Sequence, residues 1–313
     1  MKYALQRAAY SLLLLLGVSV LSFLFSELAP GDFYTEMRAD ARVTPETIAA
    51  LRAENGLDQP LPVRYATWLK SVGRGDFGYS LAYHGPVGPL LRQRVPGTLI
   101  LTGFATLIAW LLAIPLGIWS GSQPGSWPDS TLKVILSLLL CIPELLLAIA
   151  LLALAVRTGW LPVGGRNSPG HFGLYDTLRH LMIPVTVLVL GLTPVLVRHV
   201  RAAIVEAMDA PFALAARAHG IPRRRLLFRH LLPAALNPLI SLFGFSLGTL
   251  LSASLLVEVL VGWPGLGPLF LDAILARDFA LVLGVVMMST AFLVAGNLVA
   301  DLLLYRADPR IRS

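Results

Sequence analysis

The sequence predicts an all-α membrane protein with six transmembrane helices and both termini on the cytoplasmic side. Three observations predict this fold. First, 56% of the 313 residues are hydrophobic and only 14% are charged, whereas a soluble domain has about 25% charged residues. Second, six apolar segments come close to or exceed the about 20 residues that a helix needs to cross a bilayer. Third, arginines gather in short segments on one side of those helices, as the positive-inside rule expects.

The first apolar segment follows Lys2 and Arg7 and in this respect resembles a secretory signal peptide. Its apolar run is longer than the about 7–15 residues of a signal-peptide core, and Glu27-Leu28-Ala29 is a poor cleavage site. We therefore expect a retained helix. The six segments are 8–28, 98–120, 134–156, 181–197, 231–257 and 279–300.

Arginines set the expected orientation. The segment between the fourth and fifth spans carries Arg198, Arg201, Arg217, Arg223, Arg224, Arg225 and Arg229, and the C-terminal tail carries Arg306, Arg310 and Arg312. With six spans, these two regions and the N-terminus share one face, which the positive-inside rule makes cytoplasmic. The long segment 29–96 then lies in the periplasm.

The predicted organisation is an N-terminal transmembrane helix (1–28), a periplasmic segment (29–96), a five-helix core (97–305) that contains a basic loop at about 204–230, and a cytoplasmic tail (306–313). Within the periplasmic segment, Thr44 and Pro45 predict a helix start, as N-cap and first helical residue. Gly56 predicts its end. A following amphipathic helix is expected to place one face on the membrane or on the pore mouth, through Tyr65, Trp68 and Leu69.

The basic loop contains a short alanine-rich helix. Asp209 is its expected N-cap, Pro211 fits its first turn, and Gly220 ends it. Pro222 then starts a second helix that carries three consecutive arginines. Small side chains let a partner backbone approach closely, so this helix is expected to dock on another protein. The alternative is an interfacial helix that binds anionic lipid.

These residues resemble the inner-membrane permease subunits of bacterial ABC importers, in the dipeptide, oligopeptide and nickel branch. The family's cytoplasmic motif reads Glu-Ala-Ala, three residues, Gly, nine residues, Ile, one residue, Leu-Pro. The matching positions are Leu214, Ala215, Ala216, Gly220, His230, Leu232 and Pro233. Leu214 and His230 replace the motif's Glu and Ile.

The resemblance covers nearly the whole chain. The further matches are Gly17-Val18-Ser19, Ala29-Pro30-Gly31-Asp32, Gly56-Leu57-Asp58-Gln59-Pro60-Leu61, Gly75-Asp76-Phe77-Gly78, Trp160-Leu161-Pro162, Trp263-Pro264-Gly265-Leu266-Gly267, Asp272-Ala273-Ile274, Asn297, Asp301 and Asp308-Pro309-Arg310. Their shared order and spacing carry the resemblance.

The resemblance implies a coupling helix that docks on an ATPase subunit, formed by Phe212, Ala215, Ala216, Arg217, Ala218, His219 and Gly220. It also implies a second homologous permease subunit, two ATP-binding cassette subunits and a periplasmic substrate-binding protein as partners. The chain would sit in membrane lipid as a multi-pass protein of the bacterial inner membrane. ATP and Mg²⁺ would bind the partner subunits, and this chain would bind no cofactor.

Missing motifs exclude several enzyme classes. The three lysines are Lys2, Lys70 and Lys133, and none follows a glycine, so the phosphate-binding Gly-Lys of a P-loop is absent. The sequence also lacks the His-Glu-x-x-His zinc pattern and the Gly-x-Ser-x-Gly elbow. We therefore expect no enzyme and no metal site. The basic residues lie beside apolar spans, which argues against nucleic-acid binding, and the single Cys141 excludes an intrachain disulfide.

Two acidic residues are candidates for the translocation path. Glu144 lies within the third apolar segment, where a charge costs about 3 kcal/mol on insertion scales and is expected to face the bundle interior or water. It either meets a substrate cation or makes a helix–helix hydrogen bond. Glu258, near the outer end of the fifth span, either belongs to an outer gate or sits at the interface. The gate itself is expected at Trp263, Pro264 and Gly265.

The leading prediction is an importer permease for dipeptides or oligopeptides, and nickel or another metal chelate is the second substrate class. A stand-alone secondary transporter or channel would explain the spans and Glu144, but it leaves the docking helix unexplained. An intramembrane enzyme lacks its motifs.

Overall fold

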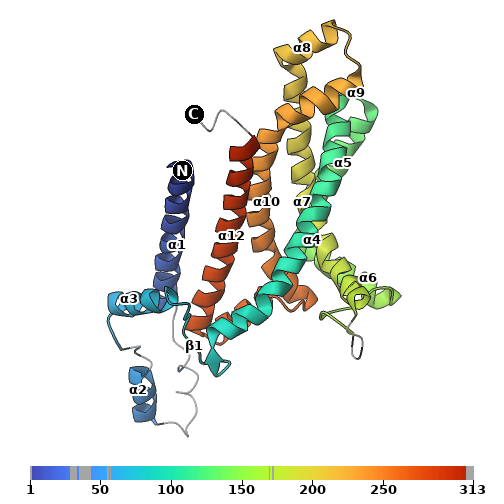
Figure 1. Cartoon of the computed structure of the whole chain (residues 1–313). Coiled ribbons are helices and arrows are strands. Elements are labelled where there is room, and N and C mark those ends of the chain that lie inside the picture. The colour runs from blue at the N-terminus through green and yellow to red at the C-terminus, as the bar shows by residue number, and fades with distance from the viewer. Residues whose placement is uncertain are drawn as a thin grey trace. The chain divides into compact units, whose positions relative to one another are not determined.

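The computed structural model describes residues 2–28, 34, 44–54, 56, 58–168, 170 and 173–307. Most of the described residues are in helices (Figure 1). The motif at 29–32, residue 57, and the tail from Asp308 onward lie outside it. The predictions made for those positions therefore stay predictions.

In chain order, the elements are α1 (Lys2–Leu28), α2 (Pro45–Glu54), α3 (Leu61–Val72), β1 (Tyr79–Ser80), β2 (Gly85–Pro86), α4 (Val87–Ser122), α5 (Trp127–Leu140), α6 (Glu144–Thr158), α7 (Leu174–Asp209), α8 (Pro211–Ala218), α9 (Arg223–Leu226), the π-helical turn η3 (Leu227–Leu231), α10 (Leu232–Val261), α11 (Leu266–Leu275) and α12 (Phe279–Ala307). They form two compact units. Residues 1–97 and 264–294 make the first unit, and residues 98–263 and 295–313 make the second. Helices α4 and α12 contribute residues to both.

In the first unit, α2 and α3 follow the predicted local signals. The Thr44 side chain accepts the Thr47 N–H at 3.3 Å, which confirms the N-cap. Gly56 has a left-handed φ of 66°, which suits a helix stop. The apolar face of α3 packs on α1: Tyr65 contacts Phe23 edge to face at 5.4 Å and shares a hydrogen bond with Ser19. That aromatic face is therefore turned toward α1.

The strands β1 and β2 pair in antiparallel register and are held to the start of α12 by Asp278. The buried Asp278 carboxylate accepts the Ser80 hydroxyl at 2.6 Å and the Ala82 N–H at 3.0 Å, and it also caps α12 through the Leu281 N–H. Nearby, the Tyr83 hydroxyl donates to Asp272 at 2.7 Å. Burial and this hydrogen bond raise the pKa of Tyr83.

The second unit is organised around α7. In the most apolar 18-residue stretch of α7, 72% of the residues are buried, whereas the corresponding stretch of α4 is 33% buried. Helix α7 is therefore the core helix, and α4 exposes a broad apolar face. Small residues bring helices together: a Cβ built on Gly117 would lie 2.6 Å from Val200 of α7, and one on Gly244 of α10 would lie 2.8 Å from Ala300 of α12. Such close approach at small residues is typical of membrane helices.

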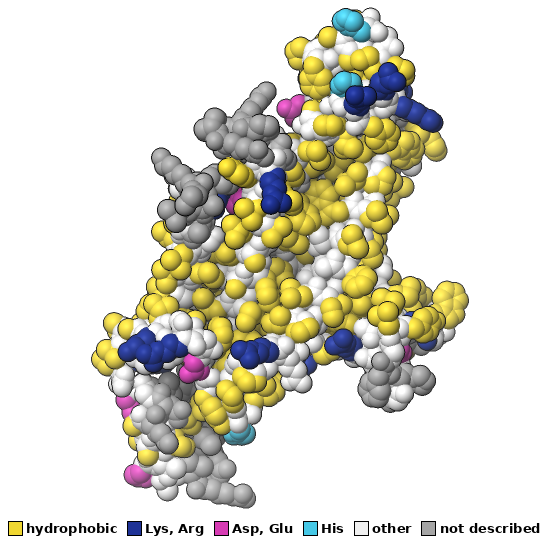
Figure 2. Space-filling model, viewed as in Figure 1, with side chains coloured by type: hydrophobic (Ala, Val, Ile, Leu, Met, Phe, Trp, Pro, Cys, Tyr) yellow, Lys and Arg dark blue, Asp and Glu magenta, His cyan; other side chains and the backbone are white. Residues whose placement is uncertain are grey.

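Four described helices are long and apolar enough to cross a membrane, and the bent pair α5–α6 makes a fifth span if it is counted as one. The four are α4, α7, α12 and the helix 223–261. Hydrophobic side chains cover much of the visible face (Figure 2). The chain is thus a mostly helical membrane protein. The apolar part of α1, Ala9–Phe25, is shorter than the other candidates.

The prediction of one continuous helix through 134–156 is wrong. Helix α5 ends at Leu140, α6 begins at Glu144, and the two axes meet at 90°. The cause is Pro143, which has no N–H to donate and disfavours helical backbone at the residue before it. Pro143 itself becomes the N-cap of α6, with φ −59° and ψ 135°.

Helix α7 also differs from its prediction of 181–197, because it runs from Leu174 through Asp209. Pro184 and Pro194 lie inside it without breaking it. The basic residues that follow the apolar run are compatible with helix, so the helix continues until Ala210 turns extended before Pro211.

Candidate coupling site

Helix α8 lies beyond the end of α7 as a separate short helix (Figure 1). Pro211 occupies its first turn, as predicted. The N-cap, however, is Ala210, with ψ 146° and no side-chain hydrogen bond, while Asp209 ends α7. The prediction of Asp209 as N-cap is therefore wrong. Pro211 determines this position, because the residue directly before a proline prefers extended backbone.

Gly220 ends α8 through a Schellman motif. The Gly220 N–H donates to the Arg217 carbonyl at 2.9 Å, and the Ile221 N–H donates to the Ala216 carbonyl at 3.1 Å. These two hydrogen bonds define the motif, which needs a left-handed residue at the position of Gly220. Its φ of 72° meets that need. The predicted helix stop is confirmed.

Helix α8 has one buried and one exposed face. Ala213 is fully buried and packs with Ala207, Leu226 and Leu231. Ala216 is half-buried against the same cluster. The remaining members of the predicted coupling set are exposed, and they are Phe212, Ala215, Arg217, Ala218, His219 and Gly220. Leu214 is also exposed, at 55%. The outer surface of α8 is thus mainly apolar, with Arg217 and His219 near its C-terminal end, and Ala216 belongs mainly to the inner, supporting face.

Arg217 of α8 and the C-cap residue His219 bind backbone carbonyls. An Arg217 guanidinium N–H donates to the Met208 carbonyl at the end of α7, at 3.2 Å. The His219 Nδ1 lies 2.8 Å from the Ala215 carbonyl, and since a carbonyl only accepts, Nδ1 carries the proton. Both contacts satisfy carbonyls at helix ends. The Arg217 contact ties α8 to the end of α7, and the His219 contact closes the end of α8 itself.

After α8, the chain returns through α9, η3 and α10. The Leu232 N–H donates to the Leu227 carbonyl five residues earlier, which is the π-helical pattern. The next residue is Pro233, whose ring would clash with the carbonyl four residues before it in a regular α-helix. The wider turn relieves that clash. The Leu232-Pro233 pair of the motif thus marks the π-helical irregularity at the start of α10.

A buried ion pair lies at the same end of the second unit. Arg201 of α7 contacts Asp129 of α5 through two hydrogen bonds, at 2.7 and 2.9 Å. The Asp129 carboxylate is 0% exposed and also accepts the Ser120 hydroxyl at 2.5 Å and the Gly125 N–H at 2.9 Å. One carboxylate therefore ties the end of α4, the α4–α5 turn and α5 to α7. No motif or spacing in the sequence predicts this pair, because its two members are 72 residues apart.

Glu144, a predicted path residue, is the first residue of α6, at the break after α5. Its side chain is half-buried and packs against Gly191 of α7, where a built Cβ would lie 3.0 Å from the carboxyl carbon. Gly191 thus leaves the room that the carboxylate occupies. A helix N-terminus favours negative charge. This position differs from the predicted one inside a continuous helix.

Glu258 is fully buried in α10, so in this conformation it lies in packed interior. Its backbone carbonyl accepts the Trp263 N–H at 2.9 Å. Trp263, the first residue of the predicted gate, is also fully buried. Pro264 and Gly265 belong to the first unit. Gly97 of the same unit lies so close to them that a Cβ built on it would be 3.2 Å from the Gly265 Cα. The segment after α10 is therefore tightly packed within each unit.

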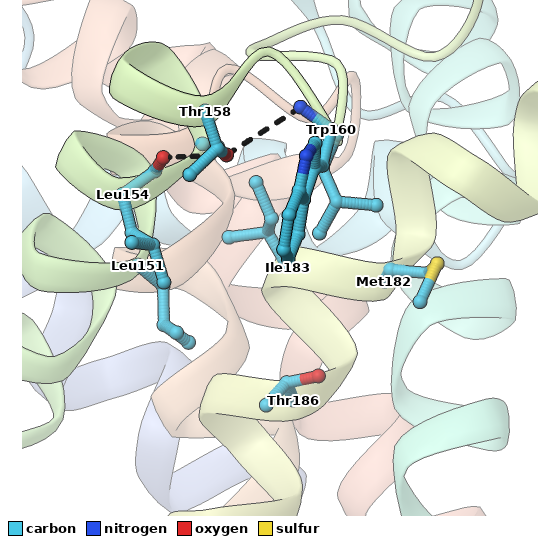
Figure 3. A pocket seen from close by; sticks show the side chains of 9 residues that line it. Leu151, Leu154, Thr158, Trp160, Met182, Ile183 and Thr186 are labelled. Atoms are coloured by element: carbon cyan, nitrogen blue, oxygen red, sulfur yellow. Dashed lines mark hydrogen bonds between the residues drawn. The ribbon is translucent and has the colours of Figure 1, made fainter.

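A small apolar pocket lies between the end of α6 and α7 (Figure 3). Thr158 closes one side by donating its hydroxyl to the Leu154 carbonyl at 2.8 Å, and it accepts the Trp160 N–H at 3.4 Å. The volume is about 110 Å³, below the about 300 Å³ at which small-molecule sites begin. This pocket is therefore too small for a peptide.

The comparisons with known proteins agree with the fold. The family described as "Binding-protein-dependent transport system inner membrane component" matches residues 113–313, and its N-terminal companion, "Binding-prot-dependent transport system membrane comp, N-term", matches residues 1–102. The chain belongs to this family. It is accordingly a multi-pass inner-membrane component of a transport system that depends on a binding protein.

Curated relatives of this inner-membrane component cover nearly its whole length. It is 34% identical to the "Oligopeptide transport system permease protein AppB" of Bacillus subtilis, over 99% of this chain and 98% of that protein. It is 32% identical to the "Probable D,D-dipeptide transport system permease protein DdpB" of Escherichia coli, over 98% of this chain and 96% of the relative.

A solved structure shares the fold of this inner-membrane component. Its title is "Inward facing conformations of the MetNI methionine ABC transporter". The TM-score is 0.54 at 22% identity, over 70% of this chain and 96% of the other. At that identity, the similarity supports the fold alone.

The left-handed backbone at Gly220 leads to a prediction. We expect Gly220→Trp to lose solute uptake while the protein reaches the membrane in normal amounts, because a side chain strains the φ of 72° and changes the end of α8. Uptake and membrane abundance are measured together. Gly220→Asn is the matched control, since Asn tolerates this conformation better than other residues. Normal uptake by the Trp variant would contradict a role for this turn.

Proposed function

We propose that this chain is the permease subunit of an ATP-driven ABC importer and forms half of the translocation path for dipeptides or oligopeptides delivered by a periplasmic binding protein. The observation that carries the proposal is α8, a separate helix with an exposed apolar face, in a chain whose family consists of binding-protein-dependent transport components. The names of its relatives support peptides as the solute.

The proposed assembly contains a second homologous permease subunit, two ATP-binding cassette subunits and the binding protein. ATP and Mg²⁺ bind the cassette subunits, which hydrolyse ATP. In this assembly α1 also crosses the membrane, which brings the number of spans to six. Both termini then lie in the cytoplasm, and residues 29–96 lie in the periplasm. The basic segment around α8 then faces the cytoplasm, as the positive-inside rule requires.

The proposed mechanism starts at α8. Closure of the ATPase dimer displaces the docked helix, and the displacement passes directly into α7 and, through α9 and η3, into α10. Ala213 packs on Leu226 and Leu231, and Arg217 binds the end of α7. The surface that docks is formed by Phe212, Ala215, Ala218, His219 and Gly220.

The outer part of the path is proposed around the end of α10. Trp263, Pro264 and Gly265 form the gate that the loaded binding protein opens. Glu258 lies buried one turn before it and would become exposed when the gate opens. Glu144 is proposed to line the path at the α5–α6 break. A carboxylate at a break between two helices is positioned to meet the ammonium group of a peptide.

Nickel or another metal chelate is the second candidate solute. Among the described residues, no group of three or more His, Cys, Asp or Glu could hold a bare metal ion. A stand-alone transporter is not favoured, because it would leave the exposed face of α8 without a role.

The test is ATP hydrolysis by the chain co-purified with its neighbouring gene products in lipid. The binding protein is added empty, loaded with a dipeptide, or loaded with a nickel chelate. Stimulation by the dipeptide load is expected. Stimulation by the chelate alone would replace the substrate class but keep the importer. The importer is contradicted if no ATPase co-purifies and solute flux follows an ion gradient instead.

A further inference from the structure

A cleft of about 390 Å³ opens beside α8 in the second unit. This volume lies within the range of small-ligand sites. The walls come from the end of α4 at Ser122, the end of α7, α8, α9 and η3. Leu227 and Leu231 line it from η3, Arg223 and Leu226 line it from α9, and Arg217 lines it from α8. The cleft thus combines an apolar wall with two guanidinium groups.

The charge of the cleft is one-sided. Each guanidinium carries five N–H donors. One of Arg217 binds the Met208 carbonyl and one of Arg223 binds the Ser122 carbonyl, so these contacts hold both groups in place while further donors remain. Among the described residues that line the cleft, none is acidic. Figure 2 shows Lys and Arg side chains gathered beside α8 and α9. This arrangement is complementary to a phosphate.

The depth of the cleft in the membrane follows from its neighbours. Ser122 ends the apolar helix α4, and two exposed tryptophans flank it in the chain, Trp119 at 49% and Trp127 at 80% exposure. Tryptophans gather where bilayer hydrocarbon meets the headgroups. This preference places the cleft near headgroup level, where Arg217 and Arg223 can reach lipid phosphates.

We propose that this cleft binds the phosphate headgroup of an anionic phospholipid. The arginines bind the phosphate oxygens, and the acyl chains extend past the half-buried Leu227. Basic pockets at the membrane surface bind anionic lipids in this way. The bound lipid would brace the joint between α7, α8 and α9, independently of the solute that is transported.

The test measures phosphatidylglycerol bound to the full-length chain in detergent by native mass spectrometry, with phosphatidylcholine as the neutral lipid. We expect preferential binding of phosphatidylglycerol. Arg217→Gln and Arg223→Gln should each weaken it about fivefold, and together about 25-fold. Each basic side chain near an anionic lipid surface strengthens binding by about that factor. Arg217→Lys with Arg223→Lys keeps the charge and should retain most of the binding.

The matched control is Arg224→Gln with Arg225→Gln, which removes two exposed charges from the same segment outside the cleft. It should change binding less than twofold. Equal losses in both double variants would overturn the cleft as the site, and equal binding of the two lipids would overturn the requirement for negative charge. Full displacement of lipid by millimolar inorganic phosphate would identify a soluble phosphate as the ligand instead.

Discussion

Asp129→Ala should be the most destabilising single substitution at the α8 end of the protein. The change leaves the Arg201 guanidinium, the Ser120 hydroxyl and the Gly125 N–H without their shared acceptor. Breaking one side of a buried ion pair costs about 3–5 kcal/mol of unfolding free energy. Unfolding in mixed detergent, followed by circular dichroism, measures this loss.

Lys133→Gln is the control for that measurement. Lys133 contacts the same carboxylate at 3.2 Å, but its side chain is 44% exposed, so its removal should cost less than about 1 kcal/mol. A double variant, Asp129→Ala with Arg201→Ala, should cost clearly less than the sum of the two single losses, because one removes the charge that the other leaves buried. Additive losses would show that the two residues stabilise the protein separately.

Ala215→Trp should lower ATP-driven uptake at least about tenfold, while the chain still inserts and folds. Ala215 is exposed on α8, so a larger side chain costs the isolated chain little, about 0.5 kcal/mol of helix propensity. It would instead fill the surface where the ATPase subunit is proposed to dock. Uptake, ATP hydrolysis and membrane abundance are compared in the same preparation.

Ala202→Trp makes the same change at an exposed alanine of α7, outside the proposed docking surface. It should leave uptake within about twofold of the parent protein. If both tryptophan variants lose uptake equally, or if Ala215→Trp transports normally, α8 does not have the specific role proposed for it.

Local signals in the sequence were sufficient where one or two residues determine the backbone. Thr44 caps α2, Pro211 starts α8 and Gly220 ends it, because each restricts φ or supplies a hydrogen bond within a few residues. The family resemblance was likewise visible from ordered motifs, and the family comparison confirms it. The start and the end of α8 follow from these signals.

Other features depend on backbone geometry or on distant partners. Hydropathy alone predicted one span through 134–156, although Pro143 was a local signal for the 90° break. Asp129 and Arg201 are 72 residues apart, so no spacing pattern pairs them. The inward placement of Ala216 depends on Leu226 and Leu231, which reach α8 only after the chain turns at Gly220.

The most direct test of docking through α8 is photo-crosslinking in the assembled complex. A photoreactive phenylalanine derivative replaces Phe212, which is 44% exposed on α8, or Phe228, which is 61% exposed in η3. We expect Phe212 to crosslink to the ATPase subunit, with a yield that changes when ATP is added, and Phe228 to give no such product. Absence of an ATPase crosslink at Phe212, or an equal crosslink at both positions, would contradict docking through α8.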